Sequence, residues 1–235
     1  MTISPAYPAI DVSLLQAAAS GETGKACDLI EQGAEVDCQG EHDGRTPLHM
    51  AALNGQRDMA NLLLNRGATR EIFDNAGDTP MHLAARHGQD GLVQLFIQRG
   101  FNIDLPNEKT GETPLMAASH DKALAAAAHL LAANADTDAQ DKGGETALMK
   151  AAKANQPGAV EALIKSFADI CMKDNKDRTA FGLAKDAQAG AALVVLYPHI
   201  QANDREKTYA MAQKLRPLNK ISVGKPLKFK KPGGA

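Results

Sequence analysis

The stretch SGETGKA, residues 20–26, is the part of the sequence that most resembles a site for phosphate chemistry. A loop that cradles nucleotide phosphates has the pattern G-x-x-x-x-G-K-[ST], in which the last hydroxyl holds magnesium. Gly24 and Lys25 supply the Gly–Lys pair, but Ala19 stands at the first glycine position and Ala26 at the hydroxyl position. A phosphate loop normally follows a β-strand. The segment that precedes this one, DVSLLQAAA, is rich in Leu and Ala and favours a helix instead. The sequence therefore argues against a nucleotide site.

Two further patterns contain side chains that could bind a metal ion. Cys27, Cys38 and His42 form C-x10-C-x3-H, which matches no common zinc spacing and lacks a fourth ligand. The segment DNAGD, residues 74–78, resembles the first half of a calcium loop, but Ala85 stands where the twelfth position requires Glu. The chain also lacks G-x-S-x-G and H-E-x-x-H. We predict no metal site, no cofactor and no catalytic site.

Composition and cysteine content favour a cytoplasmic protein. The 235 residues are 44% hydrophobic and 23% charged, with no Trp, three Tyr and six Phe, so the core must be built mainly from aliphatic residues and Ala. No apolar run approaches the roughly 18 residues that a membrane helix needs, and MTISPAYPAID does not resemble a signal peptide. Three cysteines without an export signal indicate reduced thiols. Delivery into a host cell stays open.

The net charge of −2 conceals two regions of opposite sign. Residues 1–200 carry 17 Lys and Arg against 26 Asp and Glu, a net charge of −9. Residues 201–235 carry 9 against 2, a net charge of +7. The sequence therefore predicts an acidic body followed by a basic tail.

An internal repeat organises the acidic body. A Thr-led motif recurs as TPLHMAA from Thr46, TPMHLAA from Thr79, TPLMAAS from Thr113, TALMKAA from Thr146 and TAFGLAK from Thr179. The steps are 33, 34, 33 and 33 residues. Thr can cap a helix whose first residue is Pro, and the Ala pair allows neighbouring helices to approach closely. A second helix with an apolar face follows in each unit, and Gly67 and Gly100 end it in the first two of these units.

The motif T-P-L-H-x-A-A at this spacing resembles the ankyrin repeat, over roughly residues 11–198. The resemblance implies an all-α solenoid of about six repeats joined by hairpin loops, in which SGETGKA is the turn inside the first repeat. The first helix lacks Thr-Pro, and we expect Asp11 or Ser13 to cap it. The motif histidines, His49 and His82, are expected to be structural. The motif is degenerate in the last two repeats, which we expect to be the least stable.

The expected organisation has three parts. These are an N-terminal arm, residues 1–10; a repeat domain, residues 11–200, with repeats at about 11–43, 44–76, 77–110, 111–143, 144–176 and 177–200; and a C-terminal helix and basic tail, residues 201–235.

The resemblance also implies a function, because ankyrin partners usually bind the concave groove formed by hairpin tips and first helices. We therefore expect non-catalytic binding of another protein by a monomer, rather than an enzyme that uses the repeats as a scaffold. Transferred by position, the predicted contact residues are Arg45, Asn54, Asp78, Arg86, His87, Glu112, His120, Asp121, Glu145, Lys153 and Arg178. Five of them directly precede the motif Thr residues and form a row with Arg45 and Arg178 at its ends. The three acids in the middle of this row, Asp78, Glu112 and Glu145, suggest a partner with a basic segment. The alternative is that these positions are polar only because they face water.

The tail offers a second hypothesis. Residues 203–215 can form one more helix, and the Pro- and Lys-rich end that follows is predicted to be disordered. Its lysines could bind nucleic acid or another anionic surface: Lys220, Lys225, Lys228, Lys230 and Lys231. The simpler alternative is a solubilising tail that contacts the acidic body. A single Phe among these lysines does not support base stacking.

Overall fold

The structure is a computed structural model that describes residues 8–119 and 123–200. Over these residues the chain contains helices, turns and loops but no strand, which confirms the all-α prediction. The tail hypothesis and the predicted helix at 203–215 lie outside the described residues. The elements are α1 Ala9–Ser20, α2 Thr23–Glu31, α3 Pro47–Leu53, α4 Arg57–Asn65, α5 Pro80–Arg86, α6 Asp90–Gln98, α7 Pro114–Ala117, α8 Leu124–Ala132, α9 Ala147–Lys153, α10 Pro157–Lys165, α11 Ala180–Asp186, α12 Gly190–Leu196 and the 3-10 helix η1 Tyr197–His199.

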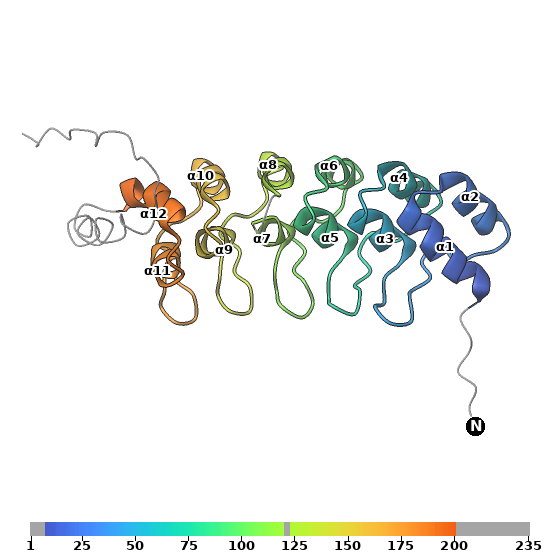
Figure 1. The fold of residues 1–235 in the computed structure, drawn as a ribbon, viewed down its shortest axis with the longest axis horizontal. Helices are drawn as coiled ribbons and strands as arrows, with labels where there is room; N and C mark the ends of the chain where they lie inside the picture. The colour runs from blue at the N-terminus through green and yellow to red at the C-terminus, as the bar shows by residue number, and fades with distance from the viewer. Residues whose placement is uncertain (1–7, 120–122, 201–235) are drawn as a thin grey trace, which may run out of the picture.

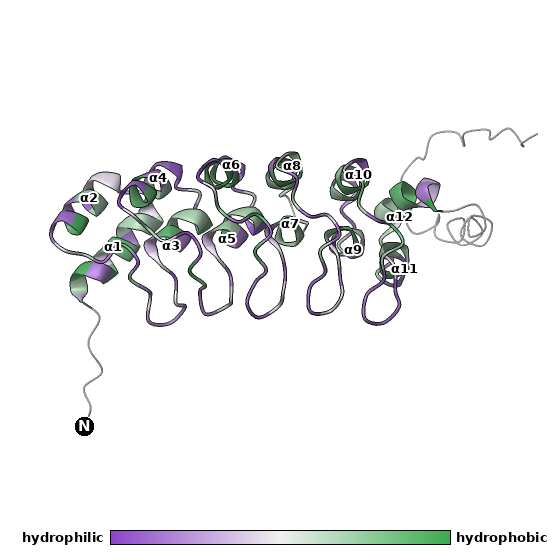
Figure 2. Ribbon diagram, turned by 180° about the vertical axis from the view of Figure 1, so that it is seen from behind, coloured by the Kyte–Doolittle hydropathy of each residue, from purple (hydrophilic) through white to green (hydrophobic). Residues whose placement is uncertain are grey.

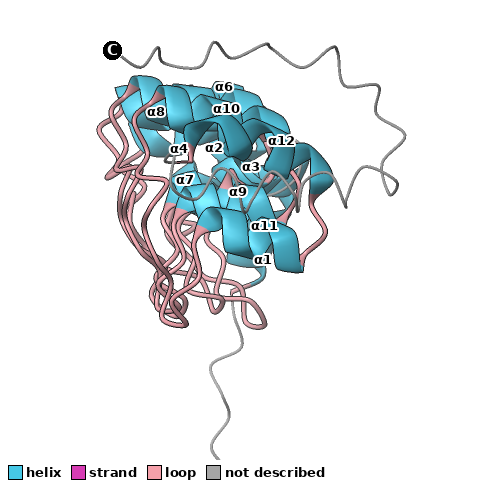
Figure 3. Ribbon diagram, turned by 90° about the vertical axis from the view of Figure 1, so that its left-hand side faces the viewer, coloured by secondary structure: helices cyan, strands magenta, loops and turns pink. Residues whose placement is uncertain are grey.

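The helices form two parallel rows that run the length of an elongated molecule (Figure 1). The odd-numbered helices are the first helices of the repeats and lie beside the loops, while the even-numbered helices form the outer row. The long loops between repeats project together from one side of the first helices (Figure 3). This arrangement confirms the solenoid of stacked helix pairs and gives the molecule one continuous face built from loops and first helices.

The Thr residues begin the first helices as predicted. Each has an extended backbone and precedes the first helical residue. The hydroxyls of Thr46, Thr113, Thr146 and Thr179 accept a backbone N–H three residues later. The acceptor distance is 3.3 Å from Met116 N to Thr113 and from Met149 N to Thr146. Free N–H groups at the helix start are satisfied in this way, so each repeat begins at a fixed residue.

Left-handed residues end the second helices. Gly67 and Gly100 follow α4 and α6 with φ of 88° and 72°. The residue after each donates back to the carbonyl five residues earlier, as Ala68 N does to Leu63 at 3.0 Å. The stretch SGETGKA contains the same kind of turn between α1 and α2, where Gly21 has φ of 77°. The structure therefore confirms a repeat turn in the place of a phosphate loop.

The predicted cap of the first helix is wrong. α1 begins at Ala9, after Pro8, so Asp11 and Ser13 lie inside its first turns. The Asp11 carboxylate instead accepts the backbone N–H of Glu35 at 2.9 Å, and the Ser13 hydroxyl donates to the carbonyl of Ala9. Asp11 is buried because it fastens the loop after α2 to the end helix. This tertiary contact, 24 residues along the chain, competes with capping and is invisible in a local pattern.

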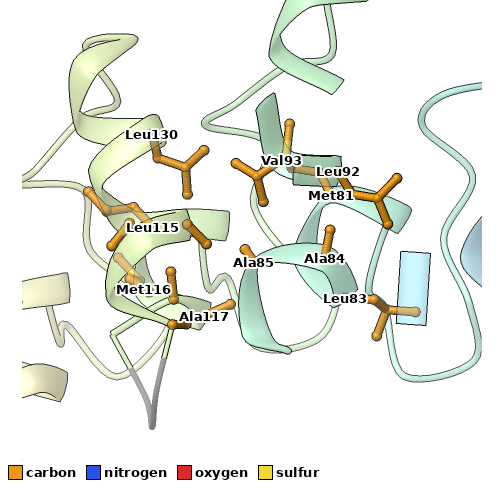
Figure 4. Packing of buried hydrophobic residues seen from close by; sticks show 14 of the residues in the cluster. Met81, Leu83, Ala84, Ala85, Leu92, Val93, Leu115, Met116, Ala117 and Leu130 are labelled. Atoms are coloured by element: carbon orange, nitrogen blue, oxygen red, sulfur yellow. The ribbon is translucent and has the colours of Figure 1, made fainter. Parts of the chain in front are cut away.

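The core runs as a continuous strip between the two rows of helices. Alanine pairs of the motif, such as Ala84 and Ala85, are fully buried and let adjacent first helices pack closely. Figure 4 shows this packing between α5–α6 and α7–α8. The hydropathy colouring shows hairpin loops that are mostly polar and helices that carry both apolar and polar residues (Figure 2). Among the described residues, Phe96 is the largest fully buried side chain, and it stacks on Phe101 with ring centroids 4.3 Å apart.

The hairpin loops are joined to one another by backbone hydrogen bonds. Asn75 N donates to the Asp43 carbonyl at 2.8 Å, and Lys142 N donates to the Thr110 carbonyl at 2.9 Å. Equivalent bonds join Glu108 to the second hairpin and Asn175 to the fourth. Each hairpin is thus bonded to the one before it, and the loops form one connected polar side of the molecule.

Candidate partner-binding face

The predicted contact residues lie along the side where the hairpins meet the first helices. A row of five immediately precedes the Thr caps: Arg45, Asp78, Glu112, Glu145 and Arg178. Four others stand at the carboxyl ends of the first helices: Asn54, Arg86, His87 and Lys153. We call these nine residues, with the hairpins before them, the groove face. His120 and Asp121 lie outside the described residues, as do Lys220, Lys225, Lys228, Lys230 and Lys231.

Arg86 joins the first two acids of the row. Its guanidinium forms a two-pronged ion pair with Asp78 and also contacts Glu112 Oε2 at 3.3 Å. Asn107 donates to the same Asp78 carboxylate at 2.7 Å. Burial by itself lowers the pKa of Arg86, but the bonds to Asp78 and the charge of Glu112 outweigh it and raise that pKa. Asp78 is thus buried and bridged across the repeats.

Lys150, which sequence analysis did not select, bridges the rest of the row. Its ammonium lies 2.7 Å from Asp141 Oδ2, 2.8 Å from Glu112 Oε1 and 3.6 Å from Glu145 Oε2. Glu145 also pairs with Lys153 at 3.1 Å. Burial lowers the pKa of Lys150, but the bonds to Asp141 and Glu112 outweigh it and raise that pKa. A sequence signal was present, because Met50, Leu83, Ala117 and Leu183 occupy this motif position in the other repeats.

The same internal pairing extends to both ends of the row. Arg45 Nε lies 3.3 Å from Asp74 Oδ2, and Arg178 Nη2 lies 2.7 Å from Asp174 Oδ2. The suggestion of a basic partner segment assumed that the row acids await cations from outside. Arg86, Lys150 and Lys153 supply those cations from within the chain, so that argument for a basic segment no longer holds.

The two motif histidines are structural, as predicted. His49 Nδ1 accepts the backbone N–H of Thr46 at 3.2 Å, and its Nε2 is 3.1 Å from the Asp78 carbonyl in the next repeat. His82 likewise lies 2.9 Å from the Glu112 carbonyl. Because a carbonyl only accepts, Nε2 carries a proton, and because Nδ1 accepts a backbone N–H in both residues, the rings are neutral. Burial lowers the pKa of both histidines, with the carbonyl bonds acting in the opposite direction.

The remaining chemical candidates of the sequence have ordinary surroundings. Cys38 is buried against the Asp11 carbonyl, and burial together with nearby acids raises the pKa of its thiol to about 12. Residues 8–119 and 123–200 hold no cluster of three His, Cys, Asp or Glu side chains suited to a metal ion. None of the described helices is both long and apolar enough to cross a bilayer.

The family follows from this fold and from a comparison of the sequence. Residues 14–107 and 89–174 match the family model described as ankyrin repeats (3 copies). The two matches together span more than half of the chain, which belongs to the ankyrin-repeat family. Ankyrin repeats are protein-interaction modules, and this supports the coarse prediction of protein binding.

The proteins similar to this chain include one in a solved complex and one curated enzyme. A solved complex of the Bd0816 predatory endopeptidase from Bdellovibrio bacteriovorus with the immunity protein Bd3460 contains a chain that is 29% identical, with a TM-score of 0.70. That similarity covers 79% of this chain and 97% of the other. The 2-5A-dependent ribonuclease of Mus musculus is 40% identical over 58 residues, which are 25% of this chain and 8% of the ribonuclease. The chain thus matches only a small part of that enzyme's length.

Proposed function

We propose that this protein is a monomer that binds another protein through the groove face, in the cytoplasm and without catalysis. The observation that carries the proposal is the network along that face. Side chains from successive repeats are bonded to one another there, from Asp78 through Arg86, Glu112 and Lys150 to Glu145. These bonds hold the polar groups of one long face in fixed positions before a partner arrives, which lowers the entropic cost of association.

A capture experiment from native cell extract tests the proposal with substitutions at exposed positions, where a change of side chain costs little stability. The groove variant is Asn54→Glu, His87→Glu and Lys153→Glu, at three exposed positions on the first helices. The matched control is Gln94→Glu, Gln98→Glu and Lys165→Glu, at three exposed positions on α6 and α10. Both change the charge by the same amount. Acids such as Asp78 are unsuitable because Asp78 is itself buried, and its replacement would break its bonds to Arg86 and Asn107.

We expect a protein that is captured by the wild type and by the control variant but lost by the groove variant. Equal capture by all three would contradict binding at the groove face. Circular dichroism must show the same helix content in all three, so that loss of capture reports binding and not unfolding.

An enzyme is the first class of partner to test. The endopeptidase complex supports this choice, because a chain of that complex is matched over nearly its whole length. We expect the activity of a captured peptidase to fall when this protein is added at a matching concentration, and the groove variant to lose that effect. A captured peptidase whose activity is unchanged would count against an inhibitory role.

The second candidate is binding of nucleic acid or an anionic surface through residues 201–235. The charge of that segment supports it, with 9 basic against 2 acidic residues. Binding through the tail should weaken steeply as salt is raised and disappear when the chain is truncated after Arg216. Binding of DNA or RNA that survives this truncation would contradict it.

A further inference from the structure

The charged groups in the middle of the groove face form two layers, and the inner layer is acidic. This middle part comprises α5, α7 and α9 with their hairpins, residues 74–86, 107–119 and 141–153. The side chains of Asp78, Glu112, Asp141 and Glu145 are only 4, 16, 10 and 13% exposed. Lys150 lies among them with a side chain that is 8% exposed. A partner would therefore find these carboxylates covered.

The outer layer is basic. The side chains of Arg86 and Lys153 are 31% and 54% exposed, and Lys109 and Lys142 are exposed on the hairpin tips. Within the three ranges just given, Glu108 is the one exposed acid. The groups that this part of the face offers to a partner are therefore mainly cations, although the chain up to residue 200 is acidic in total.

Each cation of the outer layer is held by an acceptor behind or beside it. Arg86 is fixed by Asp78 and Glu112, and Lys153 by Glu145. Lys142 Nζ donates to the Glu108 carbonyl at 2.8 Å, and Lys109 Nζ donates to the Asn75 carbonyl. Long side chains lose rotamer entropy when they bind, and part of that cost is already met in the free protein.

We propose that this outer layer binds an acidic segment of the partner protein, one that carries several Asp or Glu carboxylates. The inference rests on the proposed function and adds the chemistry of the partner. Complementary charge steers and orients such a segment. A basic segment would meet Arg86 and Lys153 first, and it could reach the row acids only by displacing their bridges.

Fluorescence anisotropy with two labelled peptides tests this inference in the full chain. One peptide is a short Glu- and Ser-containing sequence, and the other has Lys in place of each Glu. The groove-charge variant is Lys109→Glu, Lys142→Glu and Lys153→Glu. Its control is Lys25→Glu, Arg57→Glu and Lys165→Glu, which makes the same charge change at exposed residues of the outer row. A third variant, Lys228→Glu, Lys230→Glu and Lys231→Glu, removes binding by the tail.

We expect the wild type to bind the Glu peptide, and the groove-charge variant to bind it about tenfold more weakly than the outer-row control does. The affinity should also fall between about 50 and 200 mM salt. Three outcomes would overturn the inference: tighter binding of the Lys peptide, equal weakening in both variants, or loss only in the tail variant. Binding of the Lys peptide that depends on the groove face would overturn the acidic-segment inference but not the proposed protein-binding function. The capture experiment tests that function separately.

Discussion

Replacing Lys150 with Met should destabilise the array, because it removes the cation at the centre of the groove-face network. Met fits the position sterically, since Met50 occupies it in the second repeat. Glu112 and Glu145 keep Arg86 and Lys153, so the main loss is at Asp141, whose Oδ2 lies 2.7 Å from the ammonium. Removing one partner of a buried pair costs about 3–5 kcal/mol. Because two of the three acids stay paired, we expect the free energy of unfolding to fall by an amount at the lower end of this range, about 3 kcal/mol.

Thermal unfolding followed by circular dichroism measures this loss. For a chain of this length, about 3 kcal/mol corresponds to a fall in Tm of about 6–12 °C. The control is Lys153→Met, which removes an ion pair whose lysine is exposed and whose acid, Glu145, keeps Lys150; it should cost under about 1 kcal/mol. Adding Asp141→Asn to Lys150→Met should recover part of the loss, because the unpaired charge is removed while the amide oxygen still accepts from Gly143 N and Glu145 N.

The pH dependence gives a further check on the same reasoning. Since the bonds to Asp141 and Glu112 raise the pKa of Lys150 in the folded state, its stabilisation is complete below about pH 10.5 and is lost as pH rises through the folded pKa. The difference between wild type and Lys150→Met should therefore shrink only in strongly alkaline solution. If Lys150→Met unfolds at the same temperature as Lys153→Met, the bridging network does not stabilise the array and the argument is refuted.

Four other predictions follow from single contacts. His82→Met should lower the free energy of unfolding, measured in urea, by about 1–2 kcal/mol. The wild type should lose stability below about pH 6.5, because burial lowers the pKa of the native histidines and the unfolded chain takes up their protons first; the variant should lose less, and an unchanged acid profile would contradict this. Phe167→Gly should raise the free energy of unfolding by about 0.5–1 kcal/mol, because Phe167 is 91% exposed and has a left-handed backbone, with φ of 66°, that strains Phe but not Gly. A loss of stability would show that this backbone is not strained. A thiol reagent should label exposed Cys171 at once but Cys38 only on unfolding, since Cys38 is buried with a pKa raised to about 12; rapid native labelling of Cys38 would refute its burial. Amide hydrogen exchange should be faster in α11 and α12 than in α5 and α6, as expected for degenerate terminal repeats, and uniform exchange would contradict it.

Much of the fold could be predicted from the sequence because its signals are local. Thr46 and its four equivalents cap helices, and Gly67 and Gly100 end them, through bonds that span only a few residues. Repetition of these signals at a step of 33 or 34 residues requires the same unit to stack on itself. The first helix is the exception, because Asp11 forms a contact 24 residues away in place of a cap.

The positions of the candidate face were also predictable, since the residues that precede the Thr caps follow the same period. Their charge pairing was not. Arg86 reaches Glu112 across 26 residues, and Lys150 reaches Glu112 across 38. Whether these side chains meet depends on how closely adjacent first helices stack and on which rotamers the hairpins allow. No local sequence pattern contains either piece of information. The sequence determined where the polar face lies, and the tertiary structure decided that its acids are largely covered and that Arg86 and Lys153 stand in front of them.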